Sequence, residues 1–284
     1  MTTTTSARKR VKDDPPPQVP YRVAANVRQT ANAVTLMLDP VDEPIAEFRA
    51  GQFTVLNAPE FGEVAASIGG DPTIHDGVLV HTIRGVGEIN RALASADVGT
   101  ILGVRGPFGT GWRLDLPGEP DLVLVGGGYG LATVWPALWY ALANRAHYGR
   151  IMLVVGANTP AELLFSDELS IIAHSGDVEL TMTVDLATDG WTGPVGMVTE
   201  PLAALDLVAR STVALLSGPA LMLRLAAGTL VERGVRSDRI QVSLERTMNC
   251  GTWQCGECAL GPHLDCRNGP VVPYPLATSL LATH

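Results

Sequence analysis

The sequence predicts a β-barrel followed by a doubly wound α/β domain, with a cysteine-bearing segment after them. Short β-like runs separated by Gly, Pro and Asp turns extend from residue 21 to about residue 115, and such spacing is typical of a small antiparallel barrel. After residues 117–120, strand-like runs alternate with helical ones, as in a parallel sheet. All four cysteines then lie between Cys250 and Cys266.

The size and charge of the chain limit what it can be. Its 284 residues correspond to about two domains of ordinary size. With 46% hydrophobic and 17% charged residues, it can bury a sizeable core. The net charge is −9 and the only local excess of Lys and Arg lies near the N-terminus. We therefore expect no nucleic-acid partner.

Two stretches could be targeting or membrane segments. Residues 1–20 are Thr-rich, then basic, then Pro-rich, without the apolar stretch of a secretion signal, and predict a disordered tail. Residues 122–144 are uncharged, but glycines at 126–130 and Pro136 interrupt them. A strand, a tight turn and a helix fit this run better than a bilayer span. No membrane segment and a cytoplasmic location are expected.

The elements can be placed in chain order. Barrel strands are expected at residues 33–38, 53–56 and 78–83, with a short helix at 89–95. Parallel strands are expected at 122–125, 151–155, 178–184, 213–216 and 240–243, with helices notably at 133–144 and 220–233. The predicted division is a tail (1–20), a barrel domain (21–116), an α/β domain (117–243) and an otherwise irregular cysteine segment (244–284). A ligand of the α/β domain is expected at the carboxyl ends of its strands.

The cysteine spacing indicates an iron–sulfur cluster. Cys250-x4-Cys255-x2-Cys258 reproduces the plant-type order for 2Fe-2S ligands, and Cys266 supplies the fourth thiolate. The alternatives are a zinc site, which usually has two close ligand pairs, and disulfides, which a reducing cytoplasm disfavours. His263, between the last two cysteines, is expected to be solvated and not a ligand.

Two glycine turns predict a nucleotide site. Gly126-Gly127-Gly128-Tyr129-Gly130 follows the first α/β strand and opens a helix, where backbone amides and the helix dipole favour a phosphate. Ser217-Gly218-Pro219 follows the fourth strand at the same edge of the sheet. The first turn departs from the strict dinucleotide motif and could, taken alone, be merely a tight turn.

A series of motifs then resembles a known family. These motifs are residues 48–53 (FRAGQF), 82–87 (TIRGVG), 106–109 (GPFG), 127–130 (GGYG), 217–219 (SGP) and 243–246 (SLER). Together they resemble the ferredoxin-NADP reductase superfamily over nearly the whole chain after the tail. Within it, the chain is similar to the gamma subunit of cytoplasmic nickel-iron hydrogenases of the sulfhydrogenase type, and to the electron-transfer subunit of dihydroorotate dehydrogenase. The residues around Cys250 favour the hydrogenase branch.

The resemblance implies FAD in the barrel and NAD(P) in the α/β domain. The implied flavin contacts are Ala66, Ser67, Thr82, Ile83, Arg84, Ile89 and Asn90. The implied nicotinamide-dinucleotide contacts are Gly127, Gly128, Gly130, Leu131, Ser217, Gly218 and Pro219. Ser217 and Glu245 are the only candidates for a catalytic role near the flavin or nicotinamide. Residues 64–67 (VAAS) keep the serine of the family's Arg-Pro-x-Ser segment but lack its arginine and proline, which removes a charged partner for the flavin.

The implied function is that of a diaphorase subunit. NAD(P)H would give a hydride to the flavin, which would release single electrons through the cluster to the catalytic and iron-sulfur subunits of a hydrogenase-like complex. Three alternatives stay open: an electron-transfer subunit of dihydroorotate dehydrogenase, an iron-sulfur relay or scaffold without flavin, and a stand-alone reductase. Flavin absorbance and co-purifying subunits would separate them. The sequence does not decide between NAD and NADP.

Overall fold

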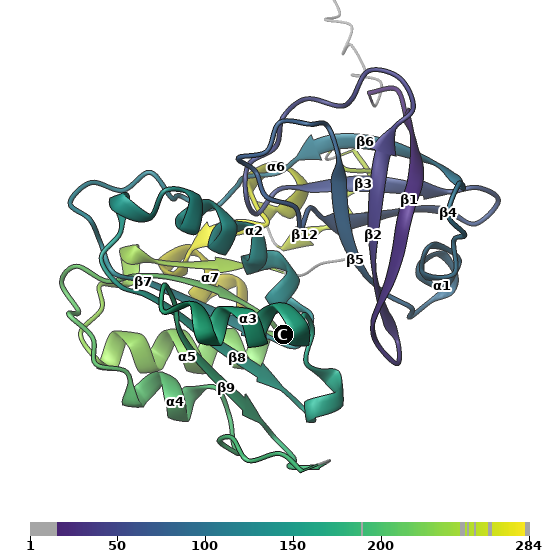
Figure 1. The fold of residues 1–284 in the computed structure, drawn as a ribbon. Helices are drawn as coiled ribbons and strands as arrows, with labels where there is room; N and C mark the ends of the chain where they lie inside the picture. Colours follow the sequence, from purple (N-terminus) through teal and green to yellow (C-terminus); the bar gives the residue numbers. More distant parts are fainter. Residues whose placement is uncertain are drawn as a thin grey trace, which may run out of the picture.

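The computed structural model shows a barrel-like unit and an α/β unit side by side (Figure 1). The structure describes residues 16–188, 190–244, 248, 250–252, 254–260 and 263–281. In this part of the chain, no helix is both long and apolar enough to cross a bilayer.

The first unit is a six-stranded antiparallel sheet, as predicted. Its strands lie in the order β4-β3-β6-β1-β2-β5. They are β1 (Val19–Thr30), β2 (Ala33–Pro40), β3 (Phe53–Ala58), β4 (Gly62–Ser67), β5 (Leu79–Arg84) and β6 (Ile101–Phe108), and α1 (Glu88–Ala94) is the expected short helix. Val19 and Pro20 belong to β1, so the prediction that the tail extends to residue 20 was wrong at its end. Pairing with β6 holds these two residues in the sheet, where Val19 lies opposite Val104 and Pro20 opposite Gly103.

The two edge strands of this sheet come together and nearly close it. The Gly69 N–H, just after β4, donates to the Val80 carbonyl of β5 over 2.7 Å. The His81 Nδ1 donates to the Ser67 carbonyl over 2.9 Å. This closure brings the end of β4 beside the end of β5, and both carry predicted flavin contacts.

The second unit is a six-stranded sheet in the order β14-β11-β10-β7-β8-β9. Five predicted parallel strands are confirmed: β7 (Leu122–Gly127), β8 (Ile151–Ala157), β9 (Glu179–Val184), β10 (Val213–Ser217) and β11 (Ile240–Ser243). The helices are α2 (Gly130–Ala143), α3 (Ser166–Ser175), α4 (Thr199–Ala204), α5 (Ala220–Glu232) and α7 (Tyr274–Leu281), with short 3-10 turns η1 (Arg145–His147), η2 (Pro160–Glu162) and η3 (Ser237–Arg239). Helix α2 begins three residues before the predicted start at 133, directly after the glycine turn.

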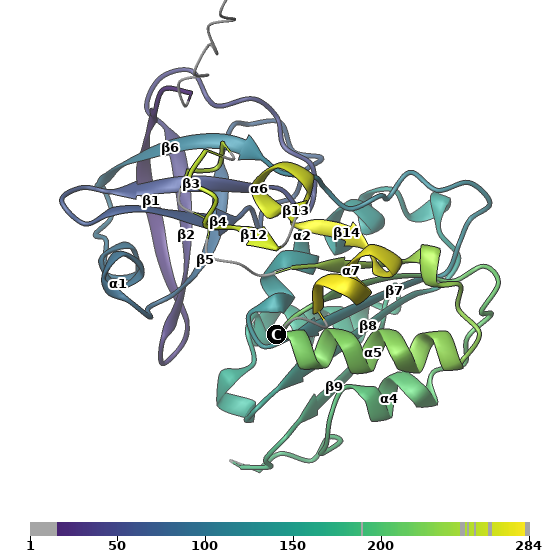
Figure 2. The same ribbon diagram turned by 180° about the vertical axis from the view of Figure 1, so that it is seen from behind.

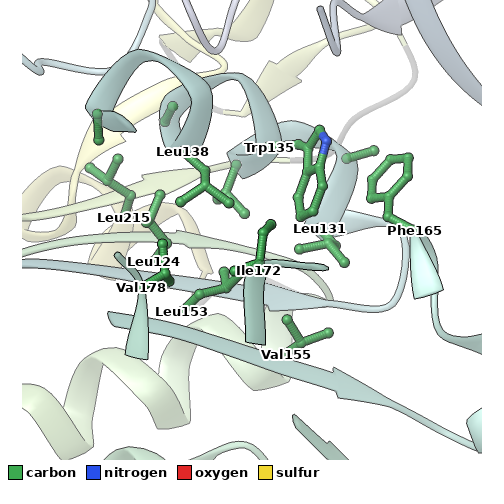
Figure 3. Packing of buried hydrophobic residues seen from close by; sticks show 14 of the residues in the cluster. Leu124, Leu131, Trp135, Leu138, Leu153, Val155, Phe165, Ile172, Val178 and Leu215 are labelled. Atoms are coloured by element: carbon green, nitrogen blue, oxygen red, sulfur yellow. The ribbon is translucent and has the colours of Figure 1, made fainter. Parts of the chain in front are cut away.

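Both faces of the parallel sheet are covered. Strands β7 and β8 are buried at every position, which explains their continuous apolar sequence. Helices α2 and α3 pack on one face, where Trp135 stacks on Phe165 with ring centroids 4.6 Å apart (Figure 3). Helices α4, α5 and α7 cover the other face. The carboxyl ends of the strands are therefore fixed on a rigid support.

The cysteine segment is more ordered than predicted. The expectation that residues 244–284 are otherwise irregular was wrong, because β14 (Val271–Pro273) pairs antiparallel with β11 and α7 packs on the sheet. Between β11 and β14 in the chain lie the two-residue strands β12 (Ala259–Leu260) and β13 (His263–Leu264) and the helical turn α6 (Asp265–Asn268). Figure 2 shows these elements beside β3 and β4 of the barrel. The apolar side chains of β14 and α7, such as Val272 and Leu280, supply the reason for this docking.

Candidate functional site

A cavity of about 610 Å³ lies where the barrel meets the carboxyl ends of the parallel strands. Its volume is in the range of ordinary small-molecule sites. Ten of the fourteen predicted cofactor contacts line it: Ala66, Ser67, Thr82, Ile83, Arg84, Asn90, Gly127, Gly128, Gly130 and Pro219. The structure thus brings the flavin and nucleotide motifs, far apart in the sequence, onto one cavity.

Hydrogen bonds fix the barrel side of the cavity. The Ser67 carbonyl accepts from His81, and its hydroxyl accepts from Thr133 of α2 over 3.4 Å. Burial lowers the pKa of His81 to about 4, against the opposing effect of the Ser67 bond. The imidazole is therefore neutral at physiological pH, donating from Nδ1 to Ser67 while Nε2 faces the Thr54 hydroxyl at 3.3 Å. Ser67 is held from both units.

Arg84 is the only lysine or arginine among the residues that line the cavity in the described part of the chain. Its guanidinium carbon lies 4.9 Å from the centre of the Tyr129 ring, in a cation–π arrangement. The Tyr129 hydroxyl donates to Asn32 Oδ1 over 2.6 Å. Tyr129 belongs to the glycine turn, whereas Arg84 and Asn32 belong to the barrel, so this group joins the two halves of the cavity and orients its one cation.

The glycines of the turn have different roles. A Cβ on Gly130 would lie 2.3 Å from the Ser217 carbonyl carbon and oxygen, so this glycine allows the two turns to pack. A Cβ on Gly127 would meet the Met222 sulfur. Gly128 has φ +54° and a Cβ there would meet nothing within 4 Å. Of the three, Gly128 alone presents an open backbone to the cavity.

Four predicted contacts do not line the cavity. Leu131 is fully buried in the core between α2 and the sheet (Figure 3). Ile89 packs beside Gly62 of the barrel, and Gly218 lies against Met222. Ser217 is also fully buried, and its hydroxyl has no hydrogen-bond partner among the described residues. Glu245 lies outside the described residues.

The cavity wall also contains residues that were not predicted from the sequence. Asn158 follows β8, Asp185 follows β9, and Met197 precedes α4. The rule that ligands of α/β sheets bind at the carboxyl ends of strands could have identified the first two. Met222 of α5 and Met248 also line the cavity, but no sequence pattern indicated them.

The four cysteines form two pairs. The sulfur atoms of Cys258 and Cys266 are 3.2 Å apart and both residues are buried. Burial raises the pKa of the Cys250 thiol, but hydrogen bonds with Cys255 and Thr252 outweigh this and bring its pKa to about 6. Thiolates are the form that binds metals. Among the described residues, no group of three or more His, Cys, Asp or Glu side chains is placed to hold a metal ion.

His263 differs from its prediction. It is 7% exposed instead of solvated, and its Nε2 lies 3.0 Å from the carboxylate of the fully buried Asp265. Burial lowers the pKa of His263. His263 lies on β13, which pairs with β12, and its side chain is buried within the cysteine segment. The sequence could not indicate this, because the strand pair is only two residues long.

The cysteine segment is seated on the barrel next to the cavity. Phe53, Ala65 and Met248 pack with Cys258 and Cys266 in one apolar cluster. The same three residues also line the cavity. In addition, the Ala65 N–H donates to the Met248 carbonyl over 3.2 Å. These three residues therefore belong both to the cavity wall and to the apolar cluster that contains Cys258 and Cys266.

Comparisons with known proteins agree with this arrangement. A family model described as an oxidoreductase NAD-binding domain matches residues 124–227. The chain is 32% identical to the sulfhydrogenase 2 subunit gamma of Pyrococcus furiosus over 254 residues, covering 84% of this chain and 87% of the relative. It is 32% identical to a probable dihydroorotate dehydrogenase B (NAD(+)) electron transfer subunit of Pyrococcus abyssi, covering 79% of each chain. A solved structure of an NADH-dependent reduced ferredoxin-NADP oxidoreductase aligns with TM-score 0.72 and 26% identity over 93% of each chain.

Proposed function

The chain belongs to the family that contains the sulfhydrogenase gamma subunits and the electron-transfer subunits of dihydroorotate dehydrogenase B, and on that premise we propose its specific role. It is an oxidoreductase subunit that carries electrons between NAD(P)H and a partner subunit, using FAD and a 2Fe-2S cluster. The observation that carries the proposal is the shared wall of Phe53, Ala65 and Met248, which line the cavity and belong to the apolar cluster that contains Cys258 and Cys266. A two-electron site and a one-electron site would thus be adjacent.

FAD fits the barrel side of the cavity. Ala66, Ser67 and Thr82 offer a backbone and hydroxyl edge, and Arg84 offers the cation that a pyrophosphate needs. When bound, the flavin would accept electrons in a pair and release them singly. Ser67 and Arg84 would hold and orient it, because His81, Thr133 and Tyr129 already fix their positions. The missing arginine and proline before Ser67 leave Arg84 as the main charged contact.

The dinucleotide fits the α/β side. Gly128 presents an open backbone at the start of α2, where a helix N-terminus favours an anionic pyrophosphate. Gly127 and Pro219, from two neighbouring strand ends, would flank it. The nicotinamide would then lie toward the barrel and the flavin. Ser217 is fully buried and does not line the cavity, so Glu245 remains the candidate side chain for contact with it. The chain's contribution is orientation and exclusion of water, and no acid or base is required.

The 2Fe-2S cluster fits the cysteines. Cys250 with Cys255 and Cys258 with Cys266 give one pair of thiolates for each iron. Cys258 and Cys266 are buried toward the flavin side, whereas Cys255 is exposed. A cluster held there would supply one-electron transfer, with Cys258 and Cys266 binding it on the buried side and Cys255 on the exposed side.

We further propose that the partners are the catalytic and iron-sulfur subunits of a cytoplasmic nickel-iron hydrogenase. The relative with 87% coverage is a sulfhydrogenase gamma subunit. The proposed flavin and dinucleotide would both occupy this cavity, so a second organic substrate would bind to another subunit. A dihydroorotate dehydrogenase partner is the second candidate, supported by the relative from Pyrococcus abyssi.

The test is anaerobic isolation of the chain with whatever binds it in the native host. We expect about two irons and one FAD per chain, together with larger metal-bearing subunits. The chain alone should reduce a one-electron dye with NAD(P)H, yet neither produce hydrogen nor oxidise dihydroorotate. Zinc in place of iron would refute the cluster, iron without flavin would favour a relay subunit, and a complete reaction by the chain alone would refute the need for a partner.

A further inference from the structure

A buried arginine of the barrel is hydrogen-bonded to the first cysteine of the cysteine segment. Arg105, on β6, is 6% exposed. Its Nη1 donates to the Cys250 carbonyl over 3.1 Å, across 145 residues of sequence. Its Nε donates to Glu63 Oε1 over 3.3 Å, and its Nη2 donates to Glu63 Oε2. One guanidinium is thus shared between a carboxylate of β4 and the backbone of a proposed cluster ligand.

The carboxylate partner is itself fixed. Glu63 is 28% exposed, and its Oε1 also accepts from the Gln18 side chain over 2.8 Å. The two charges are therefore ordered in a partly buried site next to Cys250. An arginine stays protonated at all physiological pH values, so the cation is permanent.

The neighbouring residues of the loop are seated on the same surface. Gly251 has φ +69°, and a Cβ there would lie 2.8 Å from the Phe108 ring and 3.1 Å from Val55. Glycine is thus required here both by the backbone conformation and by contact with β3 and β6. The position of the Cys250 carbonyl against Arg105 follows from this close packing.

A buried ion pair contributes little to stability, because desolvation offsets most of the attraction. It does, however, place charge where a metal group responds to it, since charges and hydrogen bonds around a site tune its reduction potential. Reduction adds a negative charge. A fixed cation stabilises the reduced state, and a fixed anion opposes it.

We propose that Arg105 is a positioning residue for the 2Fe-2S cluster, and that Arg105 and Glu63 set its reduction potential in opposite directions. Arg105 holds the Cys250 carbonyl and raises the potential, while Glu63 orients Arg105 and partly cancels its charge. This inference rests on the proposed function, because it requires a cluster at the four cysteines.

The test is an EPR-monitored redox titration of the full chain carrying its cofactors. Arg105→Met removes the cation at similar length and should shift the midpoint potential of the cluster downward. Glu63→Gln removes the anion and keeps the shape, and should shift it upward. Arg105→Lys keeps the charge and should stay closer to the parent than Arg105→Met. Arg22→Met, the same change at an exposed arginine of β1, should leave the potential unchanged.

Opposite shifts would distinguish a charge effect from a structural one, because loosening the loop would move both variants the same way. Shifts in the same direction, or no shift at full iron content, would overturn the inference. If Arg105→Met does not keep its cluster, the midpoint potential of Glu63→Gln is the deciding measurement. An upward shift supports the inference, and a downward shift or no shift overturns it. A parent chain without iron would instead refute the proposed function, and iron analysis of the parent shows this before any titration.

Discussion

Two nearby glycines of the turn, Gly128 and Gly130, should respond differently to an added side chain. At Gly128 it should mainly weaken ligand binding, and at Gly130 it should mainly destabilise the fold. Gly128 has φ +54° and open space where a Cβ would lie, whereas a Cβ on Gly130 would lie 2.3 Å from backbone atoms of Ser217. In Gly128→Ala, the left-handed conformation costs about 1–2 kcal/mol of the free energy of unfolding. For a domain of this size, 1 kcal/mol lowers the melting temperature by about 2–4 °C. The variant should therefore still fold.

The same methyl group should strongly weaken nucleotide binding. It would project into the cavity at the start of α2 and prevent close approach of the pyrophosphate to the backbone. Loss of one hydrogen bond to a charged group costs about 1.5–3 kcal/mol, which corresponds to a roughly ten- to hundredfold higher Kd for NAD(P)H. The assay is an equilibrium titration with NAD(P)H beside a thermal unfolding curve.

Two further variants make the comparison sharp. Gly176, after α3, also has positive φ and open space within 4 Å of the place that a Cβ would take, but it lies outside the cavity lining. Gly176→Ala should lose the same stability and keep the parent Kd. In Gly130→Ala, overpacking against the Ser217 backbone should lower the free energy of unfolding by about 1–3 kcal/mol or more, a larger loss than in Gly128→Ala. Parent-like NAD(P)H binding by Gly128→Ala would refute the placement of the pyrophosphate.

Two other predictions concern the barrel side of the cavity. Tyr129→Phe keeps the ring under Arg84 and loses only the bond to Asn32, so it should retain FAD better than Tyr129→Leu, which also loses a cation–π contact of about 0.5–1 kcal/mol; equal retention, measured by equilibrium dialysis, would contradict this role. Burial lowers the pKa of His81 from 6.5 to about 4. As the pH falls, the unfolded chain therefore takes up this proton at a higher pH than the folded chain does. The melting temperature should be highest above pH 6.5 and fall as the pH drops toward 4, with a loss of roughly 3 kcal/mol. His81→Gln should flatten this dependence, and an unchanged pH profile would exclude His81 as its source.

The sequence was sufficient for most of the fold because its strongest signals are local. The apolar runs at β7 and β8 and the turn residues between barrel strands define the elements without reference to tertiary contacts. The end of the chain could not be predicted in this way. Strand β14 has only three residues, and only its pairing with β11 makes it a strand.

The candidate site was likewise predictable only where its signals are local. The spacing of the four cysteines and the order of the glycine turns are readable as motifs, and the cavity brings Gly128 and Arg84 together as expected. Leu131 was placed in the site by motif but lies in the core, because helix periodicity turns it away from the cavity. The partnership of Arg105 with Cys250 spans 145 residues. No local pattern encodes such a contact.

We propose that electrons from NAD(P)H reach the iron–sulfur cluster of the cysteine segment through a flavin in the shared cavity. The most direct measurement adds NAD(P)H under anaerobic conditions to the isolated chain with full flavin and iron content, and follows flavin absorbance and the EPR signal of the cluster. We expect the flavin absorbance to be bleached and the EPR signal of a reduced 2Fe-2S cluster to appear. If NAD(P)H reduces the flavin while the cluster stays oxidised, although a chemical reductant can reduce the cluster, this electron route is refuted.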